Sequence, residues 1–420
     1  MIGAAAAALT SDGPCPSCGG RSCEAAAENP AHSVNTGARV FTSRIRNVLC
    51  GTCGLIYNDP MPTAAELAEL YQAMARDVSD RPAPATGRIM PIERDQAAFV
   101  RAHLVPAPRV LDIGCSMGGF LAALAEDGAR AVGVEPSPHD AAVARDRFGL
   151  DVRPGFFEDV EFGDDRFDLI SLRFVFEHVA TPRALVRRAR ALLAGGGLLF
   201  IDVPNLAMPF VGLDDFFSFG HLQTFTVETL SHLCALEGLA PVAIEENRNL
   251  FESSPHPPSI RALFAWPAGG RGGSGPSEGM SRADVTPAPP DVGAVRAKLD
   301  RYRAARAALV AGVQSKLREA LAGRSRVVVY GAGTHTSELW RACPWLAAQT
   351  VAMVDGNPRL QGHRFLGLPV HSPRDLPSLA PDAIVISVRT AESQIAAWLS
   401  EQGLGSITVR LYQHAGVAAA

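Results

Sequence analysis

The turn at residues 109–118 constrains the fold of this chain more than any other segment. A short apolar run at 109–113 leads through Gly114 and Gly118 into an amphipathic helix. Glycines between a strand and a helix let a ligand lie against backbone at the positive end of the helix. Glu135 ends the next apolar run, 21 residues after Gly114, where an acid can accept both hydroxyls of a ribose. The sequence therefore predicts a crevice that binds a nucleoside-like ligand.

Three further apolar runs alternate with helical patterns after this turn. They lie near residues 130–135, 167–172 and 198–203, and 195–197 is expected to be a glycine turn into the last one. Strands that alternate with helices predict a parallel sheet covered by helices on both faces. The predicted fold class is therefore α/β, with a Rossmann-like core.

The order of these motifs resembles class I S-adenosylmethionine-dependent methyltransferases over about residues 95–255. The Asp-x-Gly-x-x-x-Gly turn, the acid after the second strand, and the segments 167–172 and 177–179 carry the resemblance. In that family the aspartate lies near the methionine end of the donor, the glycines pass under the sulfonium ligand, and the acid holds the ribose. The resemblance implies these donor-binding residues, with Ser116 replacing a glycine: Asp112, Gly114, Ser116, Gly118 and Glu135.

The adenine contact is expected after the third strand of the sheet. The family often has an acidic or amide residue there, whereas this chain reads Gly155-Phe-Phe-Glu-Asp159. We expect Phe156 to pack on the adenine ring, with Glu158 or Asp159 reaching its amine.

Two Cys-x-x-Cys motifs near the N-terminus predict a structural metal site. Cys15 and Cys18 form the first pair and Cys50 and Cys53 the second, with 31 residues between the pairs. Such motifs let backbone turns aim four thiolates at one tetrahedral zinc ion. A redox dithiol and unrelated free thiols are the alternatives. Cys23 is either a substitute ligand or a buried thiol.

A second glycine turn lies in the C-terminal part of the chain. Residues 326–330 lead into Gly331-Ala-Gly333, the run 351–355 ends in an acid, and 382–387 is a third apolar run. This is half of a Rossmann pattern, in which Thr336 replaces the third glycine of a dinucleotide fingerprint. We expect a Rossmann-like scaffold, with NAD binding as the alternative.

These modules divide the chain into four parts. The predicted boundaries are a zinc-binding module at 1–62, a methyltransferase domain at 63–258, a flexible linker at 259–291 and a Rossmann-like substrate-binding domain at 292–420. A capping box at 63–66 predicts a helix that includes Leu70, Tyr71 and Met74, and another helix is expected at 92–104. The linker prediction rests on the Gly, Pro and Ser content of 266–291.

Composition bears on partners and compartment. The net charge is −4 without a sustained basic run, and Arg187, Arg188 and Arg190 are best read as a solvated helix face, so no nucleic-acid partner is expected. No apolar run approaches the roughly 18–20 residues that cross a bilayer, so no membrane partner is expected. Five of the eight cysteines lie within the first 53 residues, which favours a reducing cytoplasm over a secreted disulfide scaffold.

The order of the three modules resembles bacterial deoxysugar C-methyltransferases. The segments 53–57, 330–333 and 354–362 carry this resemblance together with the motifs above. It implies S-adenosylmethionine as methyl donor, a structural zinc ion, and a nucleotide-linked keto sugar held between the central and C-terminal domains. Less specialised methyltransferases of polysaccharide and natural-product pathways share the layout, and the sequence leaves the oligomeric state open.

The catalytic candidates are His221, His178 and Glu177. The family has a His-Glu-His run after its fifth strand, and His221 matches the second histidine while Phe219 and Gly220 replace the other two residues. Methylation at carbon needs a base that removes a proton alpha to a ketone, which suits a histidine. His178 would orient the acceptor or stabilise an enolate, and Glu177 would hold its tautomer. Structural hydrogen bonds are the alternative roles of both histidines.

Several functions remain open. C-methylation of a nucleotide-activated deoxysugar or a related natural-product intermediate is the first prediction, and O- or N-methylation is the alternative. A non-catalytic nucleotide-sugar-binding protein is the second alternative. The apolar loop 206–219 is expected to join the core, with a lid or acceptor pocket as the other interpretation; its large apolar residues are Leu206, Met208, Phe210, Phe216, Phe217 and Phe219.

Overall fold

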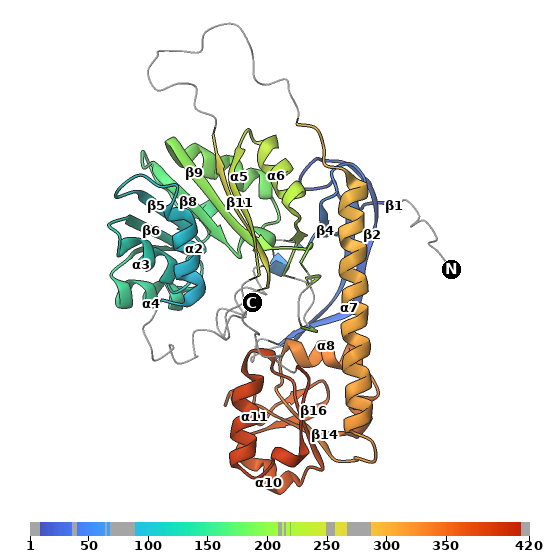
Figure 1. Cartoon of the computed structure of the whole chain (residues 1–420). Helices are drawn as coiled ribbons and strands as arrows, with labels where there is room; N and C mark the ends of the chain where they lie inside the picture. Colours follow the sequence, from blue (N-terminus) through green and yellow to red (C-terminus); the bar gives the residue numbers. More distant parts are fainter. Residues whose placement is uncertain are drawn as a thin grey trace, which may run out of the picture.

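Three β-sheets organise the chain. The computed structural model describes residues 9–35, 40–63, 65–67, 89–208, 212–213, 216–218, 220–248, 257–266 and 287–412. Within them lie sheets of five, seven and six strands, and one long helix runs beside the N-terminal sheet down to the C-terminal domain (Figure 1). Among these residues, no helix combines the length and the apolar character needed to span a bilayer.

The seven-stranded sheet forms the centre of the molecule. Its order is β11-β12-β9-β8-β5-β6-β7. The five strands from β9 to β7 are parallel, while β12 is antiparallel to both β9 and β11. The strands are β5 Arg109–Ile113, β6 Arg130–Glu135, β7 Asp151–Pro154, β8 Phe167–Arg173, β9 Leu193–Pro204, β11 Ala240–Asn247 and β12 Ser259–Ala265.

Helices cover both faces of this sheet (Figure 1). Leu111 and Ile113 of β5 enter one apolar core, and Val110 enters the core on the opposite face. Burial on both faces is typical of a parallel sheet between helices and confirms the predicted α/β class. The helices are α2 Pro91–Arg101, α3 Gly119–Ala125, α4 Pro138–Phe148, α5 Pro182–Leu192 and α6 Val227–Leu236, with single turns η1 Phe157–Asp159 and η2 Phe176–His178.

The predicted linker begins too early. Residues 259–265 form β12, which pairs with β9 and β11 inside the central sheet. Arg261 interrupts the apolar pattern of this strand, but it is buried and paired with Asp202 and Asp95. The segment 195–197 is also not a separate turn, because β9 begins at Leu193 and bulges there before its regular pairing with β8.

The N-terminal sheet includes a strand from the central domain. Its order is β1-β2-β3-β4-β10, and β10 contributes Gln223 and Thr224 opposite Tyr57 and Ile56. The predicted boundary at residue 62 therefore does not separate two independent sheets. The strands are β1 Leu9–Thr10, β2 Ser22–Asn35, β3 Val40–Cys50, β4 Ile56–Asn58 and β10 Gln223–Thr224.

The C-terminal domain has the predicted Rossmann-like architecture. Its sheet has the order β15-β16-β14-β13-β17-β18 and is parallel apart from the β15–β16 pair. The elements are α7 Val292–Ala320, β13 Val327–Tyr330, α8 Thr334–Ala342, α9 Leu346–Gln349, β14 Thr350–Val354, β15 Arg364–Phe365, β16 Leu368–His371, η3 Pro373–Asp375, α10 Leu376–Leu379, β17 Ala383–Ile386, η4 Arg389–Ala391, α11 Glu392–Glu401, η5 Gly405–Ile407 and β18 Thr408–Arg410.

Helix α7 packs against both the N-terminal sheet and the C-terminal domain. Near its start, Leu299 and Tyr302 pack with apolar residues of the N-terminal sheet and of the loop after β9. Near its end, Val313 and Leu317 enter the core of the C-terminal domain. The long hairpin of β2 and β3 runs beside α7 and reaches α8 (Figure 1).

Some predictions fall outside the described residues. The capping box at 63–66 is present, since the Thr63 N–H donates to Glu66 Oε2 over 2.8 Å. The rest of the helix predicted there, with Leu70, Tyr71 and Met74, lies outside the described residues, as do Phe210, Phe219 and most of the linker, 267–286.

Candidate active site

The turn after β5 is left-handed at three positions. The φ angles are 73° at Gly114, 49° at Ser116 and 82° at Gly118. A Cβ atom at residue 114 would lie 2.5 Å from Val175 Cγ2, and one at residue 118 would lie 2.6 Å from Leu150 Cδ1. The glycines are therefore required by the backbone and by the protein's own packing, and not only by room for a ligand.

Glu135 lies at the end of β6 and faces this turn. Its Oε2 accepts the Ser116 N–H over 2.8 Å, and its Oε1 accepts the Ser137 N–H over 2.7 Å. Burial raises the pKa of the Glu135 carboxyl to about 7. Each oxygen keeps a second lone pair, so the hydroxyls of a ribose can still donate to this carboxylate.

A second acid beside Glu135 supports the fit to a nucleoside. Asp140 is in the first turn of α4, and its Oδ1 is buried without a hydrogen-bond partner among the described residues. Burial also raises the pKa of Asp140. An orphaned buried acceptor indicates a missing donor group, and a hydroxyl-rich ligand supplies one. The acceptor groups at the carboxyl ends of β5 and β6 thus fit the nucleoside of S-adenosylmethionine.

The carboxylate of Asp112 is bonded to two protein side chains. It is fully buried, its Oδ1 accepts the Ser171 hydroxyl over 2.7 Å, and its Oδ2 pairs with Arg173 over 2.9 Å. In contrast to Glu135, the Asp112 side chain is fully buried and directed at Ser171 and Arg173. A direct role of Asp112 in donor binding stays a prediction. The guanidinium of Arg173 lies 4.3 Å from the ring centre of Phe120, the second residue of α3.

A buried polar network behind this pair was not predicted from the sequence. Arg173 donates to Gln96 over 2.8 Å, and Gln96 donates to Asp202 over 2.7 Å. Asp202 also pairs with Arg261, which contacts Asp95. The network fastens α2 to β8, β9 and β12. The sequence indicates such a network through charged residues that lie inside apolar runs. Charged residues of this kind stay buried only when they are paired.

The three predicted catalytic residues meet at one place. His178 follows β8 in η2, and His221 precedes β10, with the two ring centres 5.0 Å apart in an edge-on arrangement. Glu177 Oε1 lies 3.8 Å from His178 Nε2. Ligand-type atoms of all three residues lie within 4.8 Å of one another. We refer to Glu177, His178 and His221 as the acceptor cluster.

Backbone carbonyls orient both imidazoles. His178 Nδ1 lies 2.6 Å from the Gly220 oxygen, and His221 Nδ1 lies 3.0 Å from the Phe216 oxygen. A carbonyl only accepts, so Nδ1 carries the proton and the lone pair of each neutral ring is on Nε2. Burial lowers the pKa of His178 and raises the pKa of Glu177 to about 8. At neutral pH, His178 is therefore neutral and Glu177 mostly protonated.

The N-terminal module holds the acceptor cluster in place. The Leu222 N–H donates to the Glu177 carbonyl over 2.8 Å, and the Leu222 carbonyl accepts the Asn58 N–H over 2.9 Å. Gln223 donates from its side chain to the Val179 carbonyl over 2.6 Å. These bonds fix the segments that carry Glu177 and His221 against β4.

Phe156 lies where a ligand can reach it. It follows Gly155 (φ 131°) after β7 and is 44% exposed, which is unusual for a side chain of this size. Glu158 and Asp159 are also exposed. Stacking of Phe156 on adenine remains a prediction.

The four predicted zinc ligands form one cluster. Cys15 Sγ is 3.7 Å from Cys53 Sγ, and Cys18 Sγ is 3.5 Å from Cys50 Sγ. Tetrahedral zinc with Zn–S bonds of about 2.3 Å separates its sulfurs by about 3.8 Å. The thiol set and its spacing therefore fit zinc. Cys23 is buried outside this group, and burial raises its pKa.

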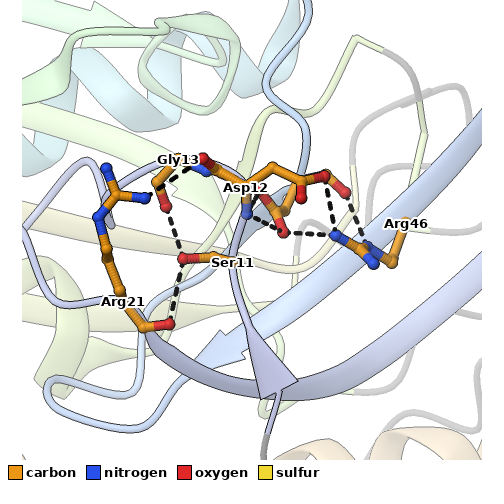
Figure 2. Close-up of polar contacts among 6 residues, drawn as sticks. Ser11, Asp12, Gly13, Arg21 and Arg46 are labelled. Carbon is orange, nitrogen blue, oxygen red and sulfur yellow. Dashed lines mark hydrogen bonds and ion pairs between the residues drawn. The ribbon is translucent and has the colours of Figure 1, made fainter.

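Polar contacts of Asp59 hold the segment before the first Cys-x-x-Cys motif against the N-terminal sheet. The buried carboxylate of Asp59 accepts the N–H groups of Asp12 and Gly13 over 3.0 and 3.3 Å, and it pairs with Arg46 over 2.7 Å. Figure 2 shows these contacts together with the Ser11 hydroxyl, which donates to the Gly13 carbonyl. Residues 11–13 come just before Cys15, so these contacts help to position the thiols of the first Cys-x-x-Cys motif.

The first two residues of the C-terminal glycine turn, Gly331 and Ala332, are buried. Gly331 has a φ of 114°, and Asp355 accepts the Ala332 N–H over 2.8 Å. His335 lies between the Ser387 hydroxyl (2.8 Å) and the Tyr412 hydroxyl (2.6 Å). This burial favours the scaffold interpretation of the turn over NAD binding.

The apolar loop after β9 packs mainly into the cores. Leu206, Phe216 and Phe217 are buried in a cluster that includes Tyr302 of α7. Leu213 is buried in the C-terminal core, and its N–H donates to the Tyr412 hydroxyl over 2.9 Å. The described part of the loop therefore agrees with the core interpretation.

Comparisons with known proteins agree with this architecture. Residues 66–244 match the family model described as a methyltransferase domain. A ubiquinone biosynthesis O-methyltransferase of Cereibacter sphaeroides is 36% identical over 136 residues, which cover 29% of this chain and 55% of that protein. The protein of that name from Methylobacterium sp. is 38% identical over 104 residues, covering 24% and 42%. The chain thus spans about half the length of the curated relatives it matches.

Two solved structures show partial similarity to this chain. A Burkholderia thailandensis 1,6-didemethyltoxoflavin-N1-methyltransferase is 19% identical with a TM-score of 0.40, and the match covers 50% of this chain and 95% of that one. The CcbJ methyltransferase from Streptomyces caelestis is 20% identical with a TM-score of 0.35, covering 46% and 96%. By its strand order and the match to the family model, the central part of the chain has the Rossmann-like fold of class I methyltransferases.

Proposed function

We propose that the protein is an S-adenosylmethionine-dependent methyltransferase that acts on a nucleotide-activated keto-deoxysugar or a related natural-product intermediate. The observation that carries this proposal is the position of two sites on one sheet edge. Glu135 is the last residue of β6, and the acceptor cluster begins just after β8, so both lie at carboxyl ends of parallel strands. Ligands of open α/β sheets bind at this edge.

C-methylation with His221 as the base is the specific reaction we propose. When bound, S-adenosylmethionine supplies an electrophilic methyl group. His221 Nε2 takes the proton alpha to the acceptor's ketone, and the resulting carbanion forms the new C–C bond while the C–S electron pair returns to sulfur. His178 orients the acceptor and stabilises the enolate oxygen, with Glu177 beside it.

The supporting modules take defined roles in this proposal. Cys15, Cys18, Cys50 and Cys53 hold a structural zinc ion that supports β4 and, through Leu222, the acceptor cluster. The C-terminal domain contributes to binding the acceptor, since the loop that carries His221 is anchored in its core through Leu213. The partner is thus a small molecule.

O-methylation is the closest alternative, and N-methylation is a variant of it. The curated relatives named above are O-methyltransferases, and an oxygen acceptor needs only proximity and one proton acceptor. A non-catalytic nucleotide-sugar-binding protein is the remaining alternative, because Ser116 replaces a glycine of the donor turn.

Exchange of the acceptor's proton separates these reactions. The acceptor is first identified by mass spectrometry of small molecules that co-purify with the protein. It is then incubated with the protein and S-adenosylhomocysteine in D2O. C-methylation predicts deuterium at the alpha carbon, and this exchange disappears in His221→Gln. A parallel reaction contains S-adenosylmethionine in place of S-adenosylhomocysteine. A product methylated at oxygen there, without exchange at the alpha carbon in the first reaction, would overturn the C-methylation proposal, and no transfer at all would favour the binding protein.

A further inference from the structure

The acceptor cluster has the geometry of a metal site as well as that of a base. We infer that Glu177, His178 and His221 reversibly bind one divalent transition-metal ion of the zinc class, and that this ion inhibits methyl transfer while it is bound. The inhibition rests on the proposed function, in which His221 takes a proton. The binding does not, because it depends only on the three side chains.

The first support is the orientation of the two histidines. Histidines that bind metals almost always donate their other ring N–H to a carbonyl, a carboxylate or water, which fixes the ring and its tautomer. His178 and His221 both do this, with the carbonyls of Gly220 and Phe216 as acceptors. A single such bond is common, but here both histidines make one, and their ring centres are 5.0 Å apart. In each ring, Nε2 is then the nitrogen that can bind a metal ion.

The second support is the buried carboxyl group. Glu177 is only 2% exposed, and its Oε2 has no hydrogen-bond partner among the described residues. A buried oxygen without a donor is costly to maintain. A cation bound by the Glu177 carboxylate together with the imidazoles would satisfy this group, whose Oε1 lies 3.8 Å from His178 Nε2.

The donor set indicates the kind of ion. Two imidazoles and one carboxylate suit zinc and neighbouring first-row divalent ions, whereas magnesium and calcium prefer oxygen alone. Ligand-type atoms of the three residues lie within 4.8 Å of one another, so modest side-chain rotation brings them around one ion. Three protein ligands leave a position open, in contrast to the closed four-thiolate site.

Inhibition follows from competition for one lone pair. Nε2 of His221 can hold a proton or a metal ion, but not both. With the ion bound, the proton alpha to the acceptor's ketone has no acceptor, and turnover stops until the ion leaves.

Titration with cobalt tests the inference on the full-length protein. Protein with one zinc ion per chain at the thiolate site is titrated with Co²⁺ by calorimetry, and we expect one further ion per chain. Glu177→Gln and His221→Gln should weaken this binding by roughly tenfold or more. Retention of the thiolate zinc and of S-adenosylhomocysteine binding shows that these variants are folded.

His103→Gln is the matched control. His103 is exposed at the end of α2, and its Nδ1 also lies near a carbonyl, that of Phe99 at 3.3 Å, without the other two ligands. This variant should bind Co²⁺ as the wild type does.

The outcomes separate the inference from the proposed function. No second ion, or a second ion that survives in both variants, overturns the metal site even if methyl transfer is observed. Binding that leaves turnover unchanged overturns the inhibition, and binding that increases turnover also contradicts the role of His221 as the base. Binding in a protein that transfers no methyl group sustains the site and contradicts the proposed function.

Discussion

The central and C-terminal domains each place an acid after the second strand of a parallel sheet, facing a glycine turn. Glu135 accepts the Ser116 N–H and Asp355 accepts the Ala332 N–H, both over 2.8 Å. The surroundings differ, however, because Ser116 is exposed and Ala332 is fully buried. Just after the C-terminal turn, the buried His335 is held by the hydroxyls of Ser387 and Tyr412, whereas Asp140 near the central turn has an unsatisfied buried oxygen.

The backbone motif that the two turns share therefore does not by itself define a binding site. The acid serves the turn itself in both domains, by satisfying backbone N–H groups that the strand-to-helix connection leaves unpaired. Whether a ligand can also bind depends on what the later parts of the chain place over the turn. We therefore expect donor binding in the central domain and a structural role for its C-terminal counterpart.

The largest expected effect distinguishes His221 of the central region from His335 of the C-terminal region. His221→Gln should lower turnover by about 10²–10⁴-fold, because the base is lost, with donor affinity unchanged. His335→Gln should instead lower the free energy of unfolding by about 1–3 kcal/mol, since two buried hydrogen bonds are broken. Steady-state kinetics and chemical denaturation measure the two effects. Equal losses of turnover in the two variants would contradict a catalytic role for His221 and a structural role for His335.

The two glycine turns should respond alike to alanine, because packing requires both. Gly118→Ala and Gly331→Ala should each destabilise by about 3 kcal/mol, from left-handed backbone strain and overpacking. At residue 331 the new Cβ would lie 2.8 Å from the Ser387 carbonyl oxygen. Gly149→Ala is the control, since its φ is 66° but nothing lies within 4 Å, and it should cost about 1 kcal/mol. Denaturant titration would refute the packing argument if all three variants were equal.

The free energy of unfolding should depend on pH through the buried carboxyl of Glu135. Its pKa is raised by burial from 4.5 to about 7, so folding favours the protonated carboxyl. The resulting stabilisation is complete below pH 4.5 and is lost as the pH rises through 7, by about 3 kcal/mol. Glu135→Gln should flatten this part of the profile in ligand-free protein. An unchanged slope between pH 5 and 8 would rule out this assignment.

The smallest effect is expected at the hydroxyl of Tyr412 in the C-terminal domain. Tyr412→Phe removes a hydroxyl that bonds both His335 and the Leu213 N–H. Stability should fall by about 1–2 kcal/mol, while affinity for the methyl donor stays the same. Thermal denaturation and donor titration test this. A changed donor affinity would show that the two regions are coupled.

Features of the fold that depend on neighbouring residues could be predicted from the sequence. The turn at 114–118, the apolar strands of the central sheet and the paired cysteine motifs are each encoded within short segments. The three residues of the acceptor cluster were also identified, since each follows a recognisable strand. Their roles remain predictions.

Features that depend on distant partners could not be predicted. Strand β12 was not recognised, because Arg261 interrupts its apolar run. A buried arginine is stable there only because Asp202 and Asp95 pair with it. The pairing of Gln223 with Tyr57 joins segments far apart in the chain. The pairing of Asp112 with Arg173 was also not predicted, because the motif of Asp112 does not reveal it.

Titration of S-adenosylhomocysteine against three proteins tests the central claim most directly. The wild type should bind one molecule per chain by calorimetry. Glu135→Gln should bind at least about tenfold more weakly, because hydrogen bonds to a charged group contribute about 1.5–3 kcal/mol. Asp355→Asn should bind as the wild type does. Equal losses in both variants, or a loss in Asp355→Asn alone, would contradict the account.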